Sequence, residues 1–207
     1  MAKNNRIKEE SPKNAISSNP ESGRASADVD SKKRVVFVSG VIDEAKASNF
    51  IRNVFSLEMQ SPSEDIVVVI DSFGGWTDSL FAMCDVMNMV TCKIHTICIG
   101  KAMSCGQILL INAPKGNRYI TPNSRIMMHE ISSFVHGKFS TIENETKEMF
   151  RIQKQVEQMI LNKTKLNKSQ LEKMLKENCY MSAKDAVKYG FADKIINKFS
   201  DLKIKNW

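Results

Sequence analysis

Short aliphatic runs alternate with stretches of helical periodicity over most of the chain. A continuous run such as residues 66–70 (IVVVI) is typical of a strand that is covered on both faces. In the helical stretches, apolar residues recur three and four positions apart, which predicts one buried face. The aliphatic runs predict strands at residues 34–38, 66–70, 93–99, 118–120 and 125–128. The periodic stretches predict helices at residues 43–60, 77–90 and 103–113, and three more beginning near Ser140, Asn167 and Ser182.

Strands that alternate with helices predict an α/β domain with parallel strands and right-handed crossovers. The 207 residues suit one medium-sized domain, and the sequence has neither a second composition boundary nor an internal repeat. Residues 1–32 are rich in Asn, Ser, Lys and Glu, so we expect them to be disordered. We therefore expect the domain at residues 33–198, with a short tail at residues 199–207.

Composition and charge argue against several classes of protein. No apolar run approaches the roughly 18 residues of a membrane span, and the first residues lack the apolar core of a secretory signal. The net charge of +7 comes from scattered Lys and Arg residues, so nucleic-acid binding is not expected. Three His and five Cys residues without C-x-x-C or H-x-x-x-H spacing predict no metal site. An odd number of Cys suits a reducing compartment, and we expect a cytoplasmic protein.

Three short segments carry residues that could do chemistry. Gly74 and Gly75 follow a predicted strand and precede a helix, where backbone N–H groups can bind an oxyanion or a phosphate. Ser104 lies at the next such junction, either as a helix N-cap or as a nucleophile whose neighbour Cys105 offers its N–H to an oxyanion. His129 ends a further strand. Because Ser104 and His129 both follow carboxyl ends of strands, we expect them at one edge of the sheet.

Four motifs, in order along the chain, resemble those of ClpP, the proteolytic subunit of the Clp proteases. They are Ser72-x-Gly74-Gly75, Gly100-x-Ala102-x-Ser104-x-Gly106, Pro122-Asn-Ser-Arg-x-Met-x-His129 and Ser182-Ala-x-x-Ala186-Val-x-Tyr-Gly190-x-x-Asp193. The resemblance extends from Arg34 to about Ile196. It implies the crotonase-like fold, a repeated ββα superhelix, with a protruding handle helix that here begins near Ser140. It also implies a serine endopeptidase.

The resemblance assigns a role to each candidate residue. Ser104 would be the nucleophile and His129 the general base that takes its proton. The backbone N–H groups of Gly75 and Cys105 would form the oxyanion hole. The substrate would bind by strand addition, along Gly74, Ser132, Ser133, Phe134 and Val135.

Asn178 stands where the family has the Asp of its catalytic triad. The Asn side-chain oxygen can orient the imidazole of His129, but it brings no negative charge to stabilise the imidazolium. A register shift of one residue would bring Glu177 to His129 instead. The sequence therefore predicts a Ser-His-Asn triad of weak or conditional activity, with Glu177 as the alternative acid.

The resemblance also implies an assembly. Family members form two stacked seven-membered rings around their polypeptide substrate, and an AAA+ unfoldase supplies the chamber. The unfoldase uses ATP, so this chain itself is expected to need no cofactor. Val67 and Val69 replace aromatic residues that typically line the unfoldase docking pocket, so we expect altered docking and consider a mixed ring with another ClpP subunit. A bacterial or phage-host cytosol, or an organelle, would be the location.

Two other functions remain open. The chain could be a catalytically silent structural or regulatory subunit of a mixed Clp ring, which would explain Asn178. It could also be a crotonase-type acyl-CoA enzyme, in which the backbone N–H groups near Gly74 and Gly75 would bind a thioester oxygen. Ser104 and His129 at peptidase positions favour the peptidase over both.

Overall fold

The computed structural model describes residues 29–202 and residue 204. Its strands are β1 (Val29–Asp30), β2 (Val35–Ile42), β3 (Ile66–Gly75), β4 (Ile94–Met103), β5 (Arg118–Ile120), β6 (Arg125–Met128), β7 (Cys179–Ser182) and β8 (Lys194–Ile195). Its helices are α1 (Glu44–Gln60), α2 (Thr77–Met89), α3 (Cys105–Asn112), α4 (Phe139–Lys163), α5 (Lys168–Lys176) and α6 (Ala183–Tyr189), followed by the 3-10 turn η1 (Phe199–Asp201). The α/β fold predicted from the sequence is confirmed.

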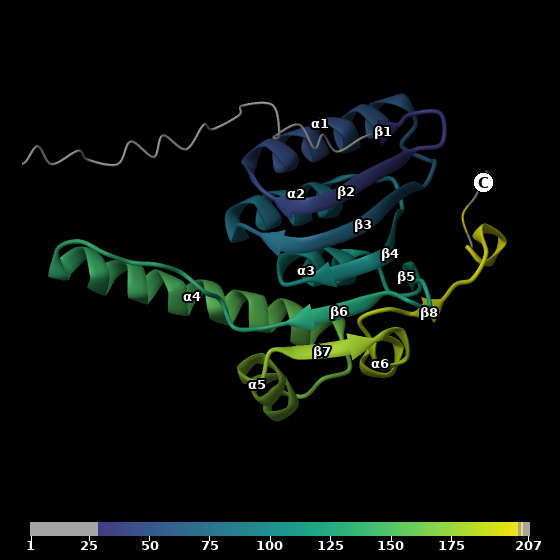
Figure 1. Ribbon diagram of the computed structural model, residues 1–207. Helices are drawn as coiled ribbons and strands as arrows, with labels where there is room; N and C mark the ends of the chain where they lie inside the picture. Colours follow the sequence, from purple (N-terminus) through teal and green to yellow (C-terminus); the bar gives the residue numbers. More distant parts are fainter. Residues whose placement is uncertain (1–28, 203, 205–207) are drawn as a thin grey trace, which may run out of the picture.

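The described strands join in one sheet, in the order β1-β2-β3-β4-β5-β8, and β6 and β7 lie off this path (Figure 1). Strand β4 divides between two partners. Its residues 96–98 pair with β5, whereas its residues 101–103 pair with β6. Strand β6 in turn pairs antiparallel with β7. Because of this division, the carboxyl ends of β4 and β6 lie side by side.

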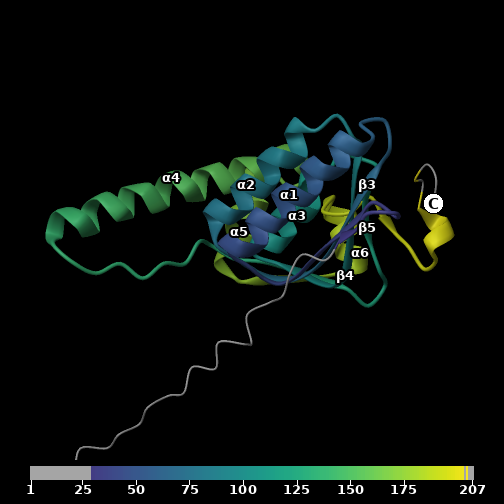
Figure 2. The same ribbon diagram turned by 90° about the horizontal axis from the view of Figure 1, so that it is seen from above.

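The sheet is covered differently on its two faces. Helices α1, α2 and α3 lie on one face (Figure 2), and the main hydrophobic core fills the space between them and the sheet. The C-terminal segment lies on the opposite face. There a smaller cluster of buried residues forms around Val67, Ile97, Tyr119 and Leu202. This second cluster explains why the central strands read as continuous aliphatic runs, since both of their faces are covered.

Helix α4 extends away from the body of the molecule (Figure 1). Its buried residues, Val156 and Ile160, belong to its C-terminal part. Towards its N-terminal end the aromatic side chains of Phe139 and Phe150 are exposed. The helix therefore has the protruding arrangement expected of a handle.

Most predicted elements are present, and the differences concern their ends. Strands β3 and β4 continue to Gly75 and Met103, beyond the aliphatic runs, because their pairing with β2 and β6 continues there. The helix predicted to begin near Ser140 is present as α4, which begins at Phe139; its N-cap is Lys138, and no side chain caps it, so the capping-box spacing of Ser140 and Glu143 is not used. Sequence analysis missed three described strands: β7, since residues 179–182 form no aliphatic run, and β1 and β8, which are only two residues long.

The chain ends fall partly outside the described residues. The predicted disorder concerns residues 1–32, of which 1–28 lie outside them, and residues 203 and 205–207 of the predicted tail do so too. Val29 and Asp30 pair with β2, so described secondary structure begins before the predicted domain boundary. In the tail, Leu202 is buried. Among the described residues, none of the helices is both long and apolar enough to cross a bilayer.

Candidate active site

The turn at the end of β3 places two glycines against neighbouring backbone. The Ser72 Oγ hydroxyl donates to the Gly40 carbonyl (2.6 Å) and accepts from the Gly74 N–H (3.0 Å), which holds the turn to β2. Gly74 has a φ of +98°, and a Cβ there would lie 2.7 Å from the Ser104 Cβ. A Cβ on Gly75 would lie 2.1 Å from the Ile42 carbonyl oxygen. Side chains are therefore excluded at both positions, and the backbone of this turn contacts Ser104 directly.

Ser104 occupies a sharp turn between β4 and α3. Its φ of +51° and ψ of −122° lie in a region that non-glycine residues rarely adopt, a strain that is typical of functional sites. The Ser104 N–H donates to the Met127 carbonyl of β6 (2.8 Å), which holds the turn in place. The Ser104 side chain makes no capping hydrogen bond to α3. Ser104 therefore occupies the N-cap position of α3, but its hydroxyl does not cap the helix.

Cys105 joins the two backbone segments that would form an oxyanion hole. It is the first residue of α3, where an N–H has no acceptor within the helix. Its Sγ–H donates to the Gly75 carbonyl (3.1 Å), which ties the start of α3 to the end of β3. Burial raises the pKa of the Cys105 thiol, so the thiol stays protonated and able to donate. The N–H groups of Gly75 and Cys105 consequently belong to segments held in contact.

His129 follows β6 directly and is half-buried. It lines a small cavity of about 70 Å³ together with Ser104, Cys105 and Gly75. Within the described part of the chain, no hydrogen bond joins the Ser104 hydroxyl to the imidazole of His129. Catalytic hydrogen bonds are often long before substrate binds, so the shared cavity is the relevant observation.

The β6–β7 ladder ends one residue before His129. Met128 pairs with Cys179 in this antiparallel ladder. Continued by one residue, the same register sets His129 opposite Asn178 and leaves Glu177 one position beyond. Asn178 has a φ of +50° and is exposed, and no hydrogen bond to His129 is formed among the described residues. The register thus favours Asn178 over Glu177 as the neighbour of the imidazole.

The predicted peptide-binding segment lies only partly at this cavity. Ser132 lines it, whereas Ser133, Phe134 and Val135 do not. Just before this segment, the Ile131 N–H donates to the Gln153 side chain of α4 (2.9 Å), which anchors it to the helix. Residues 131–136 pair with no strand in the described structure. Apart from the Ile131 N–H, the backbone groups of these residues are thus free for an added strand.

Sequence analysis missed three polar residues that line the cavity: Thr77, Gln107 and Glu130. The most deeply buried of them is Gln107. It lies three positions after Ser104, a spacing that would ordinarily indicate a helix capping box. No group of three or more His, Cys, Asp or Glu side chains suited to a metal ion occurs among residues 29–202.

Comparisons with known proteins identify the family of this chain. The family model described as Clp protease matches residues 23–199. The chain is also 35% identical, over 171 residues, to the ATP-dependent Clp protease proteolytic subunit 1 of Protochlamydia amoebophila (strain UWE25). That match covers 82% of this chain and 83% of the relative. These matches, together with the fold and the serine on its strained strand-to-helix turn, show that the chain belongs to the Clp protease family of ClpP-like peptidases.

Proposed function

We propose that this chain is a serine endopeptidase subunit that cleaves unfolded polypeptides or peptides inside an oligomeric chamber. The observation that carries the proposal is the cavity shared by Ser104, His129 and the two candidate oxyanion-hole residues. Members of the Clp protease family are serine peptidases, which fits this arrangement. Family membership also removes the reason to consider an acyl-CoA enzyme.

The mechanism follows from the position of each group. The Ser104 hydroxyl attacks the peptide carbonyl while His129 takes its proton, and the N–H groups of Gly75 and Cys105 bind the oxyanion that forms. His129 then protonates the leaving amine, and water releases the acyl group from Ser104. The strained turn at Ser104, whose hydroxyl makes no capping bond to α3, supports this role.

Asn178 is the proposed third member of the triad. Its side-chain oxygen would accept the imidazole N–H of His129 and hold the ring in the tautomer that accepts the Ser104 proton. Without a negative charge it stabilises the imidazolium poorly; in trypsin the corresponding Asp→Asn change lowers kcat about 10⁴-fold. Asn178 is exposed, so assembly or a partner subunit would be needed to order it. The activity of this chain would accordingly be weak or conditional.

A silent regulatory subunit is the second candidate. The observation that favours it is the absence of a hydrogen bond between Asn178 and His129 among the described residues. In that case the chain would contribute subunit contacts to a mixed Clp ring and would not cleave peptides itself. Exposed aromatic residues on the protruding part of the molecule are suited to subunit contacts, because Phe134 is 87% and Phe139 81% exposed.

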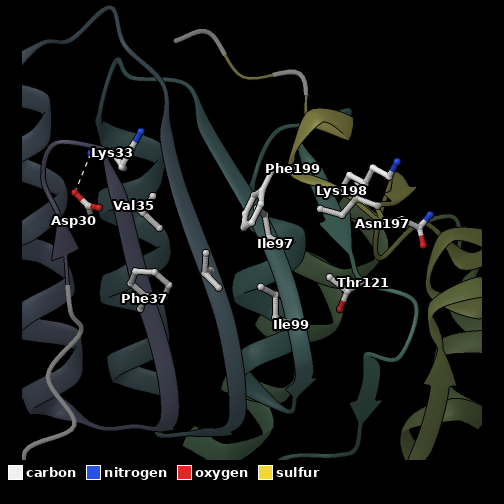
Figure 3. Close-up of a pocket in the computed structure, with 12 residues that line it drawn as sticks. Asp30, Lys33, Val35, Phe37, Ile97, Ile99, Thr121, Asn197, Lys198 and Phe199 are labelled. Carbon is white, nitrogen blue, oxygen red and sulfur yellow. Dashed lines mark hydrogen bonds between the residues drawn. The ribbon is translucent and has the colours of Figure 1, made fainter. Parts of the chain in front are cut away.

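An AAA+ unfoldase is the proposed partner, and it would dock on the face of the sheet that helices α1, α2 and α3 leave uncovered. An apolar pocket of about 490 Å³ lies there (Figure 3), lined by Phe37, Val69, Ile97 and Ile99 of the central strands. Phe199 of the C-terminal segment stands beside Ile97. Val69 leaves room where an aromatic ring would fill the pocket, whereas Val67 is fully buried and takes no part in it. The docked partner would hydrolyse ATP, and this chain would need no cofactor.

Labelling with a fluorophosphonate probe tests the proposal, because the probe reacts with activated serine nucleophiles. The purified protein should gain one adduct, located at Ser104 by peptide mapping, and Ser104→Ala should gain none. The same two proteins should give the same oligomer mass by light scattering. A folded ring that stays unlabelled, both alone and with a standard ClpP subunit added, would establish the silent role instead.

A further inference from the structure

Gln107 carries a side-chain amide that no other group in the described part of the chain satisfies. The residue lies in the first turn of α3 and is only 2% exposed. Its Oε1 is fully enclosed and has no hydrogen-bond partner. Its Nε2 donates to none of the described residues either, but it is not fully enclosed. A ligand can therefore reach this amide only at its N–H₂ group, which is a hydrogen-bond donor.

The amide lies at the wall of the small cavity beside the nucleophile. Gln107 lines this cavity, of about 70 Å³, together with Ser104 and His129. Leu80 and Ile108 contribute buried apolar walls. Since Oε1 is enclosed, the N–H₂ group is the polar part of Gln107 that can face the cavity. The volume suits one small side chain rather than a larger ligand.

The position of the cavity indicates which part of a substrate would enter it. The cavity is bounded by Ser104 and by both candidate oxyanion-hole residues, Gly75 and Cys105. The residue whose carbonyl Ser104 attacks has its Cβ only two bonds from the carbonyl carbon. The side chain of that residue, which precedes the cleaved bond, is therefore the part that would fill the cavity.

Two groups of the cavity select among such side chains. Buried polar groups nearly always have a hydrogen-bond partner, so an N–H₂ group without one points to a water molecule or a ligand. An apolar side chain would expel that water and leave the N–H₂ group unpaired, whereas an oxygen would accept a hydrogen bond from it. Glu130 lines the same cavity, and its carboxylate would repel an anionic side chain. A small, neutral acceptor meets both conditions.

We infer that Gln107 determines substrate specificity, by donating a hydrogen bond from Nε2 to a small neutral acceptor, Asn above all, at the residue before the cleaved bond. This inference rests on the proposed peptidase function. Asn fits because its carboxamide is short and uncharged and carries an acceptor oxygen. Sites built to pair with a polar substrate group reject the analogue that lacks it, because a buried group is then left unsatisfied. Apolar isosteres should therefore be poorer substrates.

Matched fluorogenic peptides test the inference by turnover. One pair carries O-methylserine, whose ether oxygen can only accept, or its isostere norvaline before the cleaved bond, and a second pair carries Asn or Leu. The wild-type protein should prefer the acceptor of each pair by about tenfold in kcat/KM, the size expected for one hydrogen bond. Gln107→Met, which has no donor, should lose or invert this preference. Gln60→Met, at the exposed end of α1, is the matched control and should retain it. Because each ratio is taken within one protein, a smaller active fraction of a variant cancels.

The contribution of Glu130 is measured with Asp in place of Asn before the cleaved bond. The wild-type protein should cleave the Asn peptide faster, and Glu130→Gln should reduce the difference. A wild-type protein that prefers Asp would contradict the assignment of a neutral acceptor.

Binding without turnover separates the inference from the proposed function. In Ser104→Ala, an NMR titration with N-acetyl tripeptide acids ending in O-methylserine or norvaline should show tighter binding of the O-methylserine peptide, and the added change Gln107→Met should abolish the difference. Such a difference in binding, without turnover or probe labelling of the protein that retains Ser104, would overturn the peptidase function and keep the inference. Equal ratios in wild type and Gln107→Met, in turnover and in binding alike, would overturn the inference itself.

Discussion

Gly74→Ala offers a direct test of how the glycine turn positions the nucleophile. The added Cβ would lie 2.7 Å from the Met103 carbonyl oxygen, 2.7 Å from the Ser104 Cβ and 2.9 Å from the Cys105 nitrogen. Two of these contacts are backbone atoms that cannot rotate away. The methyl group can therefore be accommodated only if Ser104 and the start of α3 move.

The magnitude has two parts that a second glycine can separate. An alanine at positive φ costs about 1–2 kcal/mol, and overpacking costs typically 1–3 kcal/mol more. Gly116 has nearly the same φ, +96° against +98°, yet a Cβ there would meet nothing within 4 Å. Gly116→Ala should thus show the backbone cost alone, and Gly74→Ala should be about 1–3 kcal/mol less stable than Gly116→Ala.

The assay is denaturant unfolding of both variants, followed by the rate at which the fluorophosphonate probe labels Ser104. A displacement of about 1 Å at a catalytic group can cost about 100-fold in rate, so Gly74→Ala should label about 100-fold more slowly. Gly116→Ala should label at the wild-type rate. Equal stability of the two variants, or wild-type labelling of Gly74→Ala, would refute the contact between this turn and the nucleophile.

Three further predictions concern the triad, the turn and the sheet. Asn178→Asp should raise kcat by at least about tenfold, since it restores a charge beside His129; no gain, together with a loss in Glu177→Gln, would show that Glu177 is the orienting acid. Ser72→Ala removes both hydrogen bonds of its hydroxyl and should cost about 1–3 kcal/mol in urea unfolding and slow probe labelling; an unchanged labelling rate would show that the turn holds without it. Asp193→Asn removes the negative charge from an ion pair between the half-buried Asp193 and the buried Arg118 (2.5 Å), and should cost about 1–3 kcal/mol at pH 7. Burial raises the pKa of Asp193, but the hydrogen bonds and charge of Arg118 outweigh this and lower it overall. The stabilisation is therefore complete above the unfolded pKa of about 3.9 and is lost as the pH falls through the lower folded value; a pH-independent difference between the two proteins would contradict this.

The order of strands and helices was predictable because each is encoded locally. The aliphatic runs of β3 and β4 and the apolar faces of α1 and α2 recur at the periods that these structures require. Asn167 and Ser182 were recognisable as helix caps for the same reason, since their partners lie three residues away. The start of α4 was also predicted to within one residue, but its cap was not, because the capping sequence at Ser140 lies inside the helix rather than before it.

Long-range pairing decided the rest. Residues near Ser104 and His129 are neighbours because β4 changes partners from β5 to β6, and no short segment of sequence records that change. The relation of His129 to Asn178 depends on the register of β7, a strand too polar and too short to recognise from its own residues. Gln107 shows the contrast most clearly. Its spacing from Ser104 indicates an ordinary capping box, but the Ser104 N–H donates to the Met127 carbonyl of β6 instead, because the tertiary fold brings that carbonyl to it.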